Sequence, residues 1–378
     1  MRRSKESIFK DREDPLKILL INPFGIGDVL FSTPLIEILK EDLPASSLYY
    51  ICNKRTHQVI EKCPALEKIF IFEKGDYKEL WKKDKPLFFK ELISFINKIK
   101  DERFDLAIDM SMGHQYGFFL KLIRVPERIG FDYKGRGRFH TKRLRFDGFD
   151  DRPIGEYYKD LLRLADLKVA ERTPTKIWRT KDDEDYIDGF LKRERLAGGD
   201  ILIGIAPGGG VSFGTEKIAF KRWPLGKFAE LADGLMKDMG AKVIFIWGPG
   251  ERDLVERIAD LMSERPVISP ETTIRQMAVL MSRCDCVVCN DSGPLHVAVA
   301  SGAPTVSIFG PSDQRVYGPY PEDSRHITVT RDIDCRPCYK KFKVPDCTGL
   351  DCLNGLDSRE VFRAVTGHIR EQSLNVNA

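Results

Sequence analysis

The chain has 378 residues, 42% of them hydrophobic and 31% charged, and its 61 basic against 57 acidic side chains leave a net charge of +4. At roughly 100–200 residues per domain, this length predicts two domains, each large enough for its own core. The composition excludes a disordered chain and a disulfide-stabilised mini-protein, and the small net charge does not indicate a nucleic-acid partner.

Residues 1–15 form a charged leader without the apolar stretch of an export signal. No segment approaches the ~20 apolar residues of a membrane-spanning helix. We therefore expect a cytoplasmic protein, in which the nine cysteines are thiols or metal ligands rather than disulfides.

Short apolar runs alternate with amphipathic segments in two successive sets, the pattern of parallel β-sheets covered by helices. In the first set, strands are expected at 17–21, 47–51, 68–72 and 105–110, with RIGFDY as a further candidate, and helices at 29–42, 56–63, 86–101 and 114–124. A polar stretch near 170–200 is the expected linker. In the second set, strands are expected at 201–207, 242–248, 286–290 and 304–310, and helices at 225–239, 251–263 and 294–301. The prediction is an α/β chain of two Rossmann-like, doubly wound domains facing across a cleft, with ligands at the carboxyl ends of the strands.

A buried strand, a glycine-containing turn and a helix follow one another in KILLINPFGIGDVLFSTPLIEILK. Gly25 and Gly27 allow the backbone to turn tightly beside a ligand, and Asp28 lies where the helix begins. On position alone, Asp28 is an N-cap for that helix. Leu30 stands where a dinucleotide fingerprint would have its third glycine, so a dinucleotide site is not indicated.

A second strand, glycine turn and helix occur in IGIAPGGG and FKRWPLGKFAELADGL. Gly208, Gly209 and Gly210 would expose backbone amides near a strand end, and Lys221 and Arg222 would add the cationic donors that a phosphate site requires. The G-K-[ST] ending of a P-loop is missing, which excludes that class of NTPase. A solvated basic pair beside a core tryptophan explains the same residues without a ligand.

The most informative segment is CVVCNDSGPLHVAVASGAPTVSIFGPSDQRVYGPY. Asp291, Ser292 and Gly293 end a buried strand and begin a helix, where the amides favour an anion and the carboxylate suits sugar hydroxyls. His296 is spaced to reach the same helix end. The alternatives are a cap for Asp291 and a half-buried core position for His296. Glu251 follows the glycine turn WGPG, where an acid usually compensates the helix dipole.

Two charged clusters could be either ligand-binding sites or solvated surface. Residues 112–146 carry nine Lys or Arg against two acids, and this basic patch is either a binding surface for an anionic ligand or a solvated loop. Asp183-Glu184-Asp185 has the form of a D-x-D metal motif, but it lies in a helical charge run. We expect those three side chains on the solvated surface.

Four late cysteines have the spacing Cys335-x2-Cys338-x8-Cys347-x4-Cys352. They could form a tetrahedral zinc or iron thiolate site that stabilises a loop without a core. Reduced structural thiols and two disulfides are the competing interpretations. The other five cysteines fall in strands and helices and are expected in the core.

Taken together and in order, the motifs over residues 16–365 resemble those of glycosyltransferase family 9, the lipopolysaccharide heptosyltransferases. The matching pieces are GIGD with Pro34, KRWP, the glycine turn with Glu251, NDSG-P-x-H-x-A, FGPSDQRVYGPY and the C-x-P-C cysteines. The resemblance implies a GT-B fold with an acceptor-binding domain over 16–180 and a nucleotide-sugar domain over 200–357, which includes the cysteine-rich segment 335–352. It also implies that a helix over 358–378 packs back on the first domain.

The resemblance further implies an inverting transfer without a divalent metal, of heptose from ADP-heptose to an anionic inner-core acceptor. Asp28 would be the general base, and Lys221 would hold the donor diphosphate. The implied donor-site residues are Gly208, Gly209, Lys221, Glu251, Asp291, Ser292, Gly293 and His296. The candidate acceptor contacts are Gly27, Arg136, Arg138, Lys142, Arg143 and Arg145. No cofactor is required, and peripheral contact with the cytoplasmic face of the inner membrane fits a lipid-linked acceptor.

Two departures from the family pattern concern the donor. Ser292 stands where many members have Thr, and the stretch from Gly208 to Lys221 is longer than usual, which puts the nucleotide sugar in question. The alternatives are another donor or acceptor within the family, a nucleotide-sugar epimerase or hydrolase of the same fold, and, least favoured, a non-catalytic nucleic-acid-binding protein.

Overall fold

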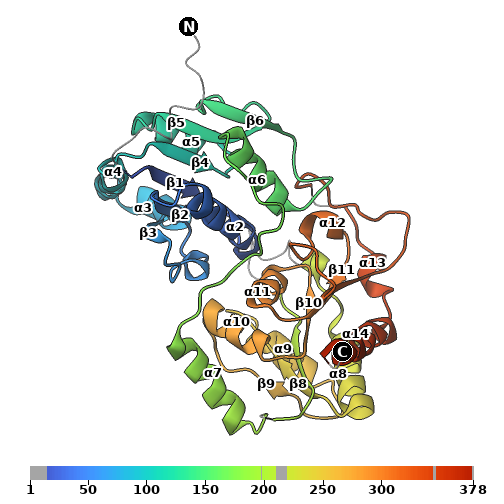
Figure 1. Cartoon of the computed structure of the whole chain (residues 1–378). Coiled ribbons are helices and arrows are strands. Elements are labelled where there is room, and N and C mark those ends of the chain that lie inside the picture. Colours follow the sequence, from blue (N-terminus) through green and yellow to red (C-terminus); the bar gives the residue numbers. More distant parts are fainter. Residues whose placement is uncertain (1–14, 197, 210–218, 344–345, 377–378) are drawn as a thin grey trace. The chain divides into compact units, whose positions relative to one another are not determined.

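The computed structural model describes residues 15–196, 198–209, 219–343 and 346–376, and the chain divides into two compact units (Figure 1). The first unit contains Met1–Asp147 and Gly155–Thr173, and the second contains Gly148–Ile154 and Pro174–Ala378. The predicted leader and residues 210–218 of the long glycine loop lie largely or wholly outside the described residues.

The first unit is built on a six-stranded, fully parallel sheet of order β3-β2-β1-β4-β5-β6. The strands are β1 (Lys17–Ile21), β2 (Ser47–Cys52), β3 (Leu66–Ile71), β4 (Leu106–Asp109), β5 (Glu127–Tyr133) and β6 (Lys142–Phe146). The helices are α2 (Ile26–Asp42), α3 (Lys74–Lys83), α4 (Lys85–Lys100), α5 (His114–Leu122) and α6 (Ile154–Leu164), with a 3₁₀ turn at His57–Val59. That single turn replaces the helix expected at 56–63.

The second unit repeats this plan with a sheet of order β12-β11-β10-β7-β8-β9, again fully parallel. Its strands are β7 (Leu202–Ala206), β8 (Lys242–Phe245), β9 (Val267–Ile268), β10 (Cys286–Asn290), β11 (Thr305–Phe309) and β12 (His326–Thr330). Its helices are α7 (Lys181–Arg193), α8 (Leu225–Met239), α9 (Arg252–Ala259), α10 (Ile274–Ser282), α11 (Gly293–Ser301), α12 (Gln314–Tyr317), α13 (Asp351–Asn354) and α14 (Ser358–Val376), with a 3₁₀ turn at Ala219–Lys221.

The central strands are apolar on both faces because helices cover both faces of a parallel sheet. Every residue of β4, β7, β10 and β11 is buried, and the last four residues of β1 are buried as well. These strands therefore appear in the sequence as continuous apolar runs. The edge strand β6 instead has charged residues among its apolar ones, which is why the apolar-run criterion missed it.

In both sheets the strand order, counted along each half of the chain, is 3-2-1-4-5-6. The order reverses direction between the first and fourth strands, and ligands of doubly wound folds bind at the carboxyl ends of the strands at this point. The first unit therefore presents the loops after β1 and β4, and the second unit presents the loops after β7 and β10. Asp28 follows β1, and the Gly208–Gly209 turn and Asp291 follow β7 and β10.

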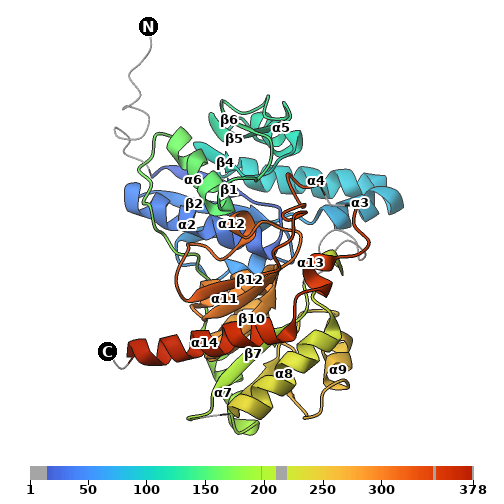
Figure 2. The ribbon, with the colours of Figure 1, turned by 90° about the vertical axis from the view of Figure 1, so that its right-hand side faces the viewer.

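The C-terminal helix packs its apolar stripe within the second unit, and its expected packing on the first domain stays a prediction. Val361, Val365 and Ile369 of α14 are spaced four residues apart, and they are buried in the core of the second unit. Figure 2 shows α14 lying alongside α8. The apolar stripe of α14 is thus covered within its own unit.

Asp183 also differs from expectation, because it is buried rather than solvated. It forms a capping box with Thr180 at the start of α7, and its carboxylate receives a 2.8 Å hydrogen bond from Nε of Arg275 on α10. The D-x-D-like sequence is therefore a helix start anchored by an ion pair.

Candidate active site

Asp28 lies in the first turn of α2 and completes the cap of that helix. Gly25 is the N-cap residue, and its backbone N–H donates to Oδ2 of Asp28 over 3.1 Å. The helix begins at Ile26, so Asp28 is its third residue rather than the N-cap expected from position. Gly27 lies beside it in the same turn. Asp28 is half-buried and negative at a helix N-terminus, where the helix dipole stabilises a carboxylate.

Buried polar groups surround Asp28, and sequence reasoning did not identify them. Asn22, at the end of β1, donates from its side chain to the Asp28 carbonyl over 2.9 Å. Burial and the negative charge of Asp28 raise the pKa of Tyr158 well above its ordinary value. Tyr158 on α6 therefore stays a neutral phenol next to the carboxylate. Asn22 ends a strand and is followed by a turn, which is the only local signal that marks it.

A second polar pair lies at the end of β4, across the switch point of the first sheet. Asp109 accepts a 3.0 Å hydrogen bond at Oδ2 from Nε2 of His140, and both side chains are almost fully buried. A Cβ at Gly130 would collide with the His140 ring, so the glycine makes room for this pair. The pair fixes the end of the 134–140 loop to the sheet. The two residues are 31 positions apart, and nothing local in the sequence connects them.

The basic patch divides between that loop and the edge strand β6. Arg136 and Arg138 are exposed and lie over the rings of Tyr133 and Phe139 at 5.5 and 4.9 Å. On β6, Arg143 and Arg145 alternate with apolar residues and are exposed. Lys142 is partly buried and pairs with Asp166 at 3.1 Å. The four arginines therefore remain on the surface as candidate contacts for an anionic group.

In the second unit, Glu251 holds the glycine turn after β7 to the end of β8. One carboxylate oxygen accepts from the Gly209 amide at 3.0 Å and the other from the Gly248 amide at 3.1 Å. Arg222 donates to the same carboxylate at 3.4 Å and to the Gly209 carbonyl at 3.1 Å. Glu251 is only 4% exposed, and a Cβ at Gly208 would collide with its carboxylate. Glu251 therefore positions the Gly208–Gly209 turn relative to the end of β8.

Lys221 and Asp291 meet at the switch point of the second sheet. Nζ of Lys221 is 2.6 Å from Oδ2 of Asp291, and the two side chains are 22% and 5% exposed. The rings of Tyr317 and Tyr339 lie 5.2 and 5.0 Å from the same Nζ. An ammonium group has three N–H donors, so pairing with one carboxylate oxygen leaves capacity for a ligand. The expectation of a solvated basic pair at Lys221 and Arg222 is therefore wrong, because both cations are partly buried and paired.

The residues around Asp291 form the wall of the same site. Asn290 donates to the Pro207 carbonyl at 2.7 Å and accepts from the Trp223 amide at 3.1 Å, which connects β7, β10 and the start of α8. Ser292 is the N-cap residue of α11, and Gly293 is the first residue of that helix. The hydroxyl of Ser292 donates to the Asn290 carbonyl at 3.2 Å. Ser292 and Gly293 were predicted site residues, whereas Asn290 was visible in the sequence only as part of the NDSG motif.

His296 lies one turn into α11 and is 7% exposed. Its burial, together with the positive charge of Lys221, lowers its pKa to about 4, and the charge of Asp291 acts in the opposite direction. The imidazole is therefore neutral at pH 7. It can exchange hydrogen bonds with a polar ligand but adds no positive charge to the site.

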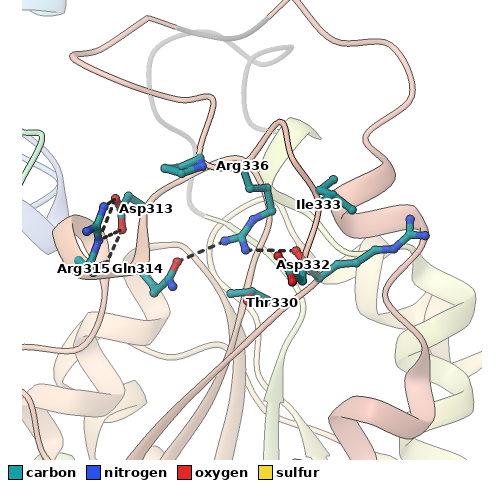
Figure 3. A pocket seen from close by; sticks show the side chains of 9 residues that line it. Asp313, Gln314, Arg315, Thr330, Asp332, Ile333 and Arg336 are labelled. Atoms are coloured by element: carbon teal, nitrogen blue, oxygen red, sulfur yellow. Dashed lines mark hydrogen bonds and ion pairs between the residues drawn. The ribbon is translucent and has the colours of Figure 1, made fainter.

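A pocket of about 290 Å³ lies beyond the carboxyl ends of β11 and β12 (Figure 3). Three arginines contribute to its lining, at positions 315, 331 and 336. Arg315 forms a two-oxygen ion pair with Asp313. Arg336 donates to the Gly310 and Arg331 carbonyls and to the Gln314 side chain. Those two guanidinium groups organise the loops of this pocket.

The four late cysteines share one segment, with Cys335 and Cys347 exposed, Cys338 partly exposed and Cys352 buried. All are free thiols. Burial and the neighbouring thiols raise the pKa of Cys338 and of Cys352. Within the described residues, no group of three or more His, Cys, Asp or Glu side chains is arranged to hold a metal ion. The zinc or iron site stays a prediction. The other five cysteines are buried, as expected.

The two switch points offer different functional groups that a group-transfer reaction can use. The first unit offers a half-buried carboxylate that can accept a proton. The second unit offers an ammonium group, a buried carboxylate and a neutral imidazole around a helix N-terminus, a combination that suits a ligand carrying both hydroxyls and negative charge.

A family model and curated relatives indicate one family. The family model described as "Glycosyltransferase family 9 (heptosyltransferase)" matches residues 92–348. The lipopolysaccharide core heptosyltransferase OpsX of Haemophilus influenzae is 24% identical over 315 residues, which cover 82% of this chain and 83% of that protein.

Two solved structures show the same fold. A glycosyl transferase family 9 protein from Veillonella parvula has a TM-score of 0.78 and 24% identity, with 95% of this chain and 99% of that chain covered. E. coli heptosyltransferase WaaC with ADP-2-deoxy-2-fluoro heptose has a TM-score of 0.69 and 15% identity, with 93% and 99% covered. The predicted GT-B fold of two Rossmann-like domains is confirmed.

Proposed function

The chain belongs to glycosyltransferase family 9, and from this premise we propose that it transfers a heptose from ADP-heptose to an anionic inner-core acceptor of lipopolysaccharide. The observation that carries the proposal is the Lys221–Asp291 pair at the switch point of the second sheet. It lies where a nucleotide sugar is expected in a doubly wound domain, and it combines a cation for a diphosphate with an acceptor for hydroxyls. The name of the OpsX relative and the heptose analogue in the WaaC structure support heptose as the sugar.

In the proposed donor site, the second unit binds the leaving group. Lys221 donates to the diphosphate, and the Gly293 amide at the start of α11 faces the same negative charge. Asp291 accepts hydrogen bonds from sugar or ribose hydroxyls, and the Ser292 hydroxyl can donate or accept one. His296 exchanges hydrogen bonds with the ligand as a neutral imidazole. Glu251 keeps the Gly208–Gly209 turn in place. Its carboxylate is also proposed to contact the nucleotide.

In the proposed reaction, Asp28 takes the proton of the acceptor hydroxyl. The acceptor oxygen then bonds to the anomeric carbon while the bond from that carbon to the diphosphate oxygen breaks, and ADP leaves with the electron pair. Attack from the side opposite the leaving group inverts the anomeric configuration. Because Lys221 and helix amides counter the developing charge, the step requires no divalent metal.

The acceptor is proposed to contact the first unit through its exposed arginines. Arg136, Arg138, Arg143 and Arg145 can bind carboxylates or phosphates through paired N–H donors. Lys142 would contribute only if its pair with Asp166 opens, and Gly27 would contact the acceptor from its position next to Asp28. Within the described parts of the chain, no helix has the length and apolar character to cross a membrane. Peripheral contact with a lipid-linked acceptor at the cytoplasmic membrane surface is a separate part of the proposal, suggested by the nature of the acceptor.

The test has two stages. Calorimetric titration with ADP-, UDP- and GDP-sugars should show selective binding of ADP-heptose, and preference for another nucleotide would overturn the donor. Incubation with ADP-heptose and a heptose-deficient acceptor should add one heptose, as seen by mass spectrometry. NMR of the new linkage should show the inverted configuration, and EDTA should leave the rate unchanged. Release of free sugar without transfer would favour the hydrolase or epimerase alternative.

A further inference from the structure

We propose that the α3–α4 hairpin, residues 74–100, is the surface through which this protein binds an anionic lipid bilayer. The proposal rests on the proposed function, because a lipid-linked acceptor is what gives membrane contact a purpose. The hairpin belongs to the first unit, and Figure 2 shows its two helices extending side by side away from the sheet of that unit.

Large apolar side chains cover this hairpin but are not buried by the fold. Its helix α3 has no buried residue, and α4 has one, Ile99. Trp81, Phe89 and Ile93 are 43%, 50% and 54% exposed. Phe89 and Ile93 are four residues apart, so they lie on one face of α4. Water contact with side chains of this size is unfavourable, and such a patch usually marks an interaction site.

Aromatic contacts hold the patch in a fixed shape. Phe72, next to the core of the first unit, stacks on Tyr77 with centroids 4.8 Å apart. Tyr77 contacts Phe88 at 6.2 Å, and Phe88 contacts Trp81 at 5.0 Å near the connection between the two helices. The exposed rings are therefore the outer end of a packed row of aromatic side chains rather than mobile surface residues. A preformed apolar surface loses little conformational entropy on binding.

The charge around the patch identifies its partner. Residues 74–100 contain eight lysines and four acidic residues, a net charge of +4 that equals the net charge of the whole chain. Lys82, Lys85 and Lys90 alternate with the exposed apolar residues, and Lys85 lies 5.4 Å from the centroid of Trp81. Lysines beside Trp, Phe and Ile are the composition of helices that lie in the bilayer interface, with about 1 kcal/mol per lysine from anionic headgroups. Two copies of so basic a surface would repel one another, which argues against a dimer contact.

Vesicle co-sedimentation of the full chain tests the proposal without any need for sugar transfer. The probe is phosphatidylcholine vesicles with about 30% phosphatidylglycerol, compared with pure phosphatidylcholine. We expect binding to the anionic vesicles that weakens as salt is raised. Phe89→Gln/Ile93→Gln should lower the apparent affinity at least tenfold, and Lys82→Glu/Lys90→Glu should do the same on anionic vesicles.

Matched controls come from the second unit. Leu261, 60% exposed, is changed to Gln, and Lys192→Glu/Lys237→Glu changes the net charge by the same amount as the hairpin variant. Both controls should bind like the parent, and circular dichroism should show that all four variants are folded. Equal binding by hairpin and control variants would overturn the proposal. So would a parent dimer that ignores vesicles and dissociates in the Phe89→Gln/Ile93→Gln variant. Hairpin-dependent binding by a protein that transfers no heptose would refute the proposed function instead.

Discussion

Replacing Lys221 with Met tests the central ion pair, because Met keeps an unbranched stem but removes the charge. Lys221 Nζ lies 2.6 Å from Oδ2 of Asp291 and is the cation assigned to the donor diphosphate. Loss of one such stabilising group typically slows the chemical step by about 10²–10³. We therefore expect transfer by Lys221→Met to fall by that factor, with weaker binding of ADP-heptose.

The same substitution should affect stability, because it leaves a buried carboxylate without its partner. Asp291 is 5% exposed, and breaking a fully buried pair costs about 3–5 kcal/mol. Lys221 is 22% exposed, so solvent compensates part of the loss, and a decrease of ~1–3 kcal/mol in unfolding free energy is expected. Adding Asp291→Asn removes the unpaired charge. The double variant should regain most of the stability and none of the activity.

Urea unfolding of the parent, the two single variants and the double variant gives the coupling free energy, and a radiolabelled-heptose assay gives the rates. Transfer within tenfold of the parent by Lys221→Met would refute its role at the diphosphate. A double variant no more stable than Lys221→Met would refute the argument that Asp291 is left buried and unpaired.

Three further substitutions examine the surrounding site. Asp28→Asn should stay folded, because the side-chain oxygen of Asn can still accept the bond from the Gly25 amide, yet transfer should fall by about 10²–10⁴ in the same assay. Gly208→Ala should push its methyl group into the Glu251 carboxylate, weakening ADP-heptose binding in calorimetry by tenfold or more and lowering stability by about 1–3 kcal/mol. His296 has a folded pKa of about 4 against an ordinary value of 6.5, so the unfolded chain binds more protons between these values and stability falls as pH drops from 6.5 to 4. His296→Gln should remove about 1–2 kcal/mol of the stability difference between pH 7 and pH 5, measured by urea unfolding.

Each of these expectations has a contrary outcome. Normal turnover by Asp28→Asn would reduce Asp28 to a helix cap. Unchanged donor affinity in Gly208→Ala would mean that the glycine turn lies away from the ligand. An identical pH dependence in parent and His296→Gln would show that this imidazole is not the group whose protonation opposes folding.

The sequence predicted those features that depend on neighbouring residues. Continuous apolar runs identified most of the central strands, and the strand-turn-helix pattern placed Asp28 and Asp291 at the correct ends of their strands. These predictions succeed because a strand buried on both faces must be apolar throughout. The Ser292 and Gly293 helix start was visible for the same local reason.

Features that depend on distant partners were missed or misread. Asp183 appeared solvated because its partner Arg275 is 92 residues away, and a buried acid is recognisable only once that partner is known. The His140–Asp109 pair was missed for the same reason, because its two residues are 31 positions apart. The contacts of the C-terminal helix within the second unit were not predicted, since its apolar stripe indicates burial but not the surface that buries it.

The contacts of Glu251 distinguish the glycine turn of this protein from that of a P-loop. In a P-loop the amides of the glycine turn point at a bound phosphate, whereas here the Gly209 and Gly248 amides already donate to Glu251. The Glu251 carboxylate thus accepts the hydrogen bonds that a bound phosphate accepts in a P-loop. The turn is thus held by a side chain of its own chain, and in the proposed donor site the diphosphate is left to Lys221 and the amide at the start of α11.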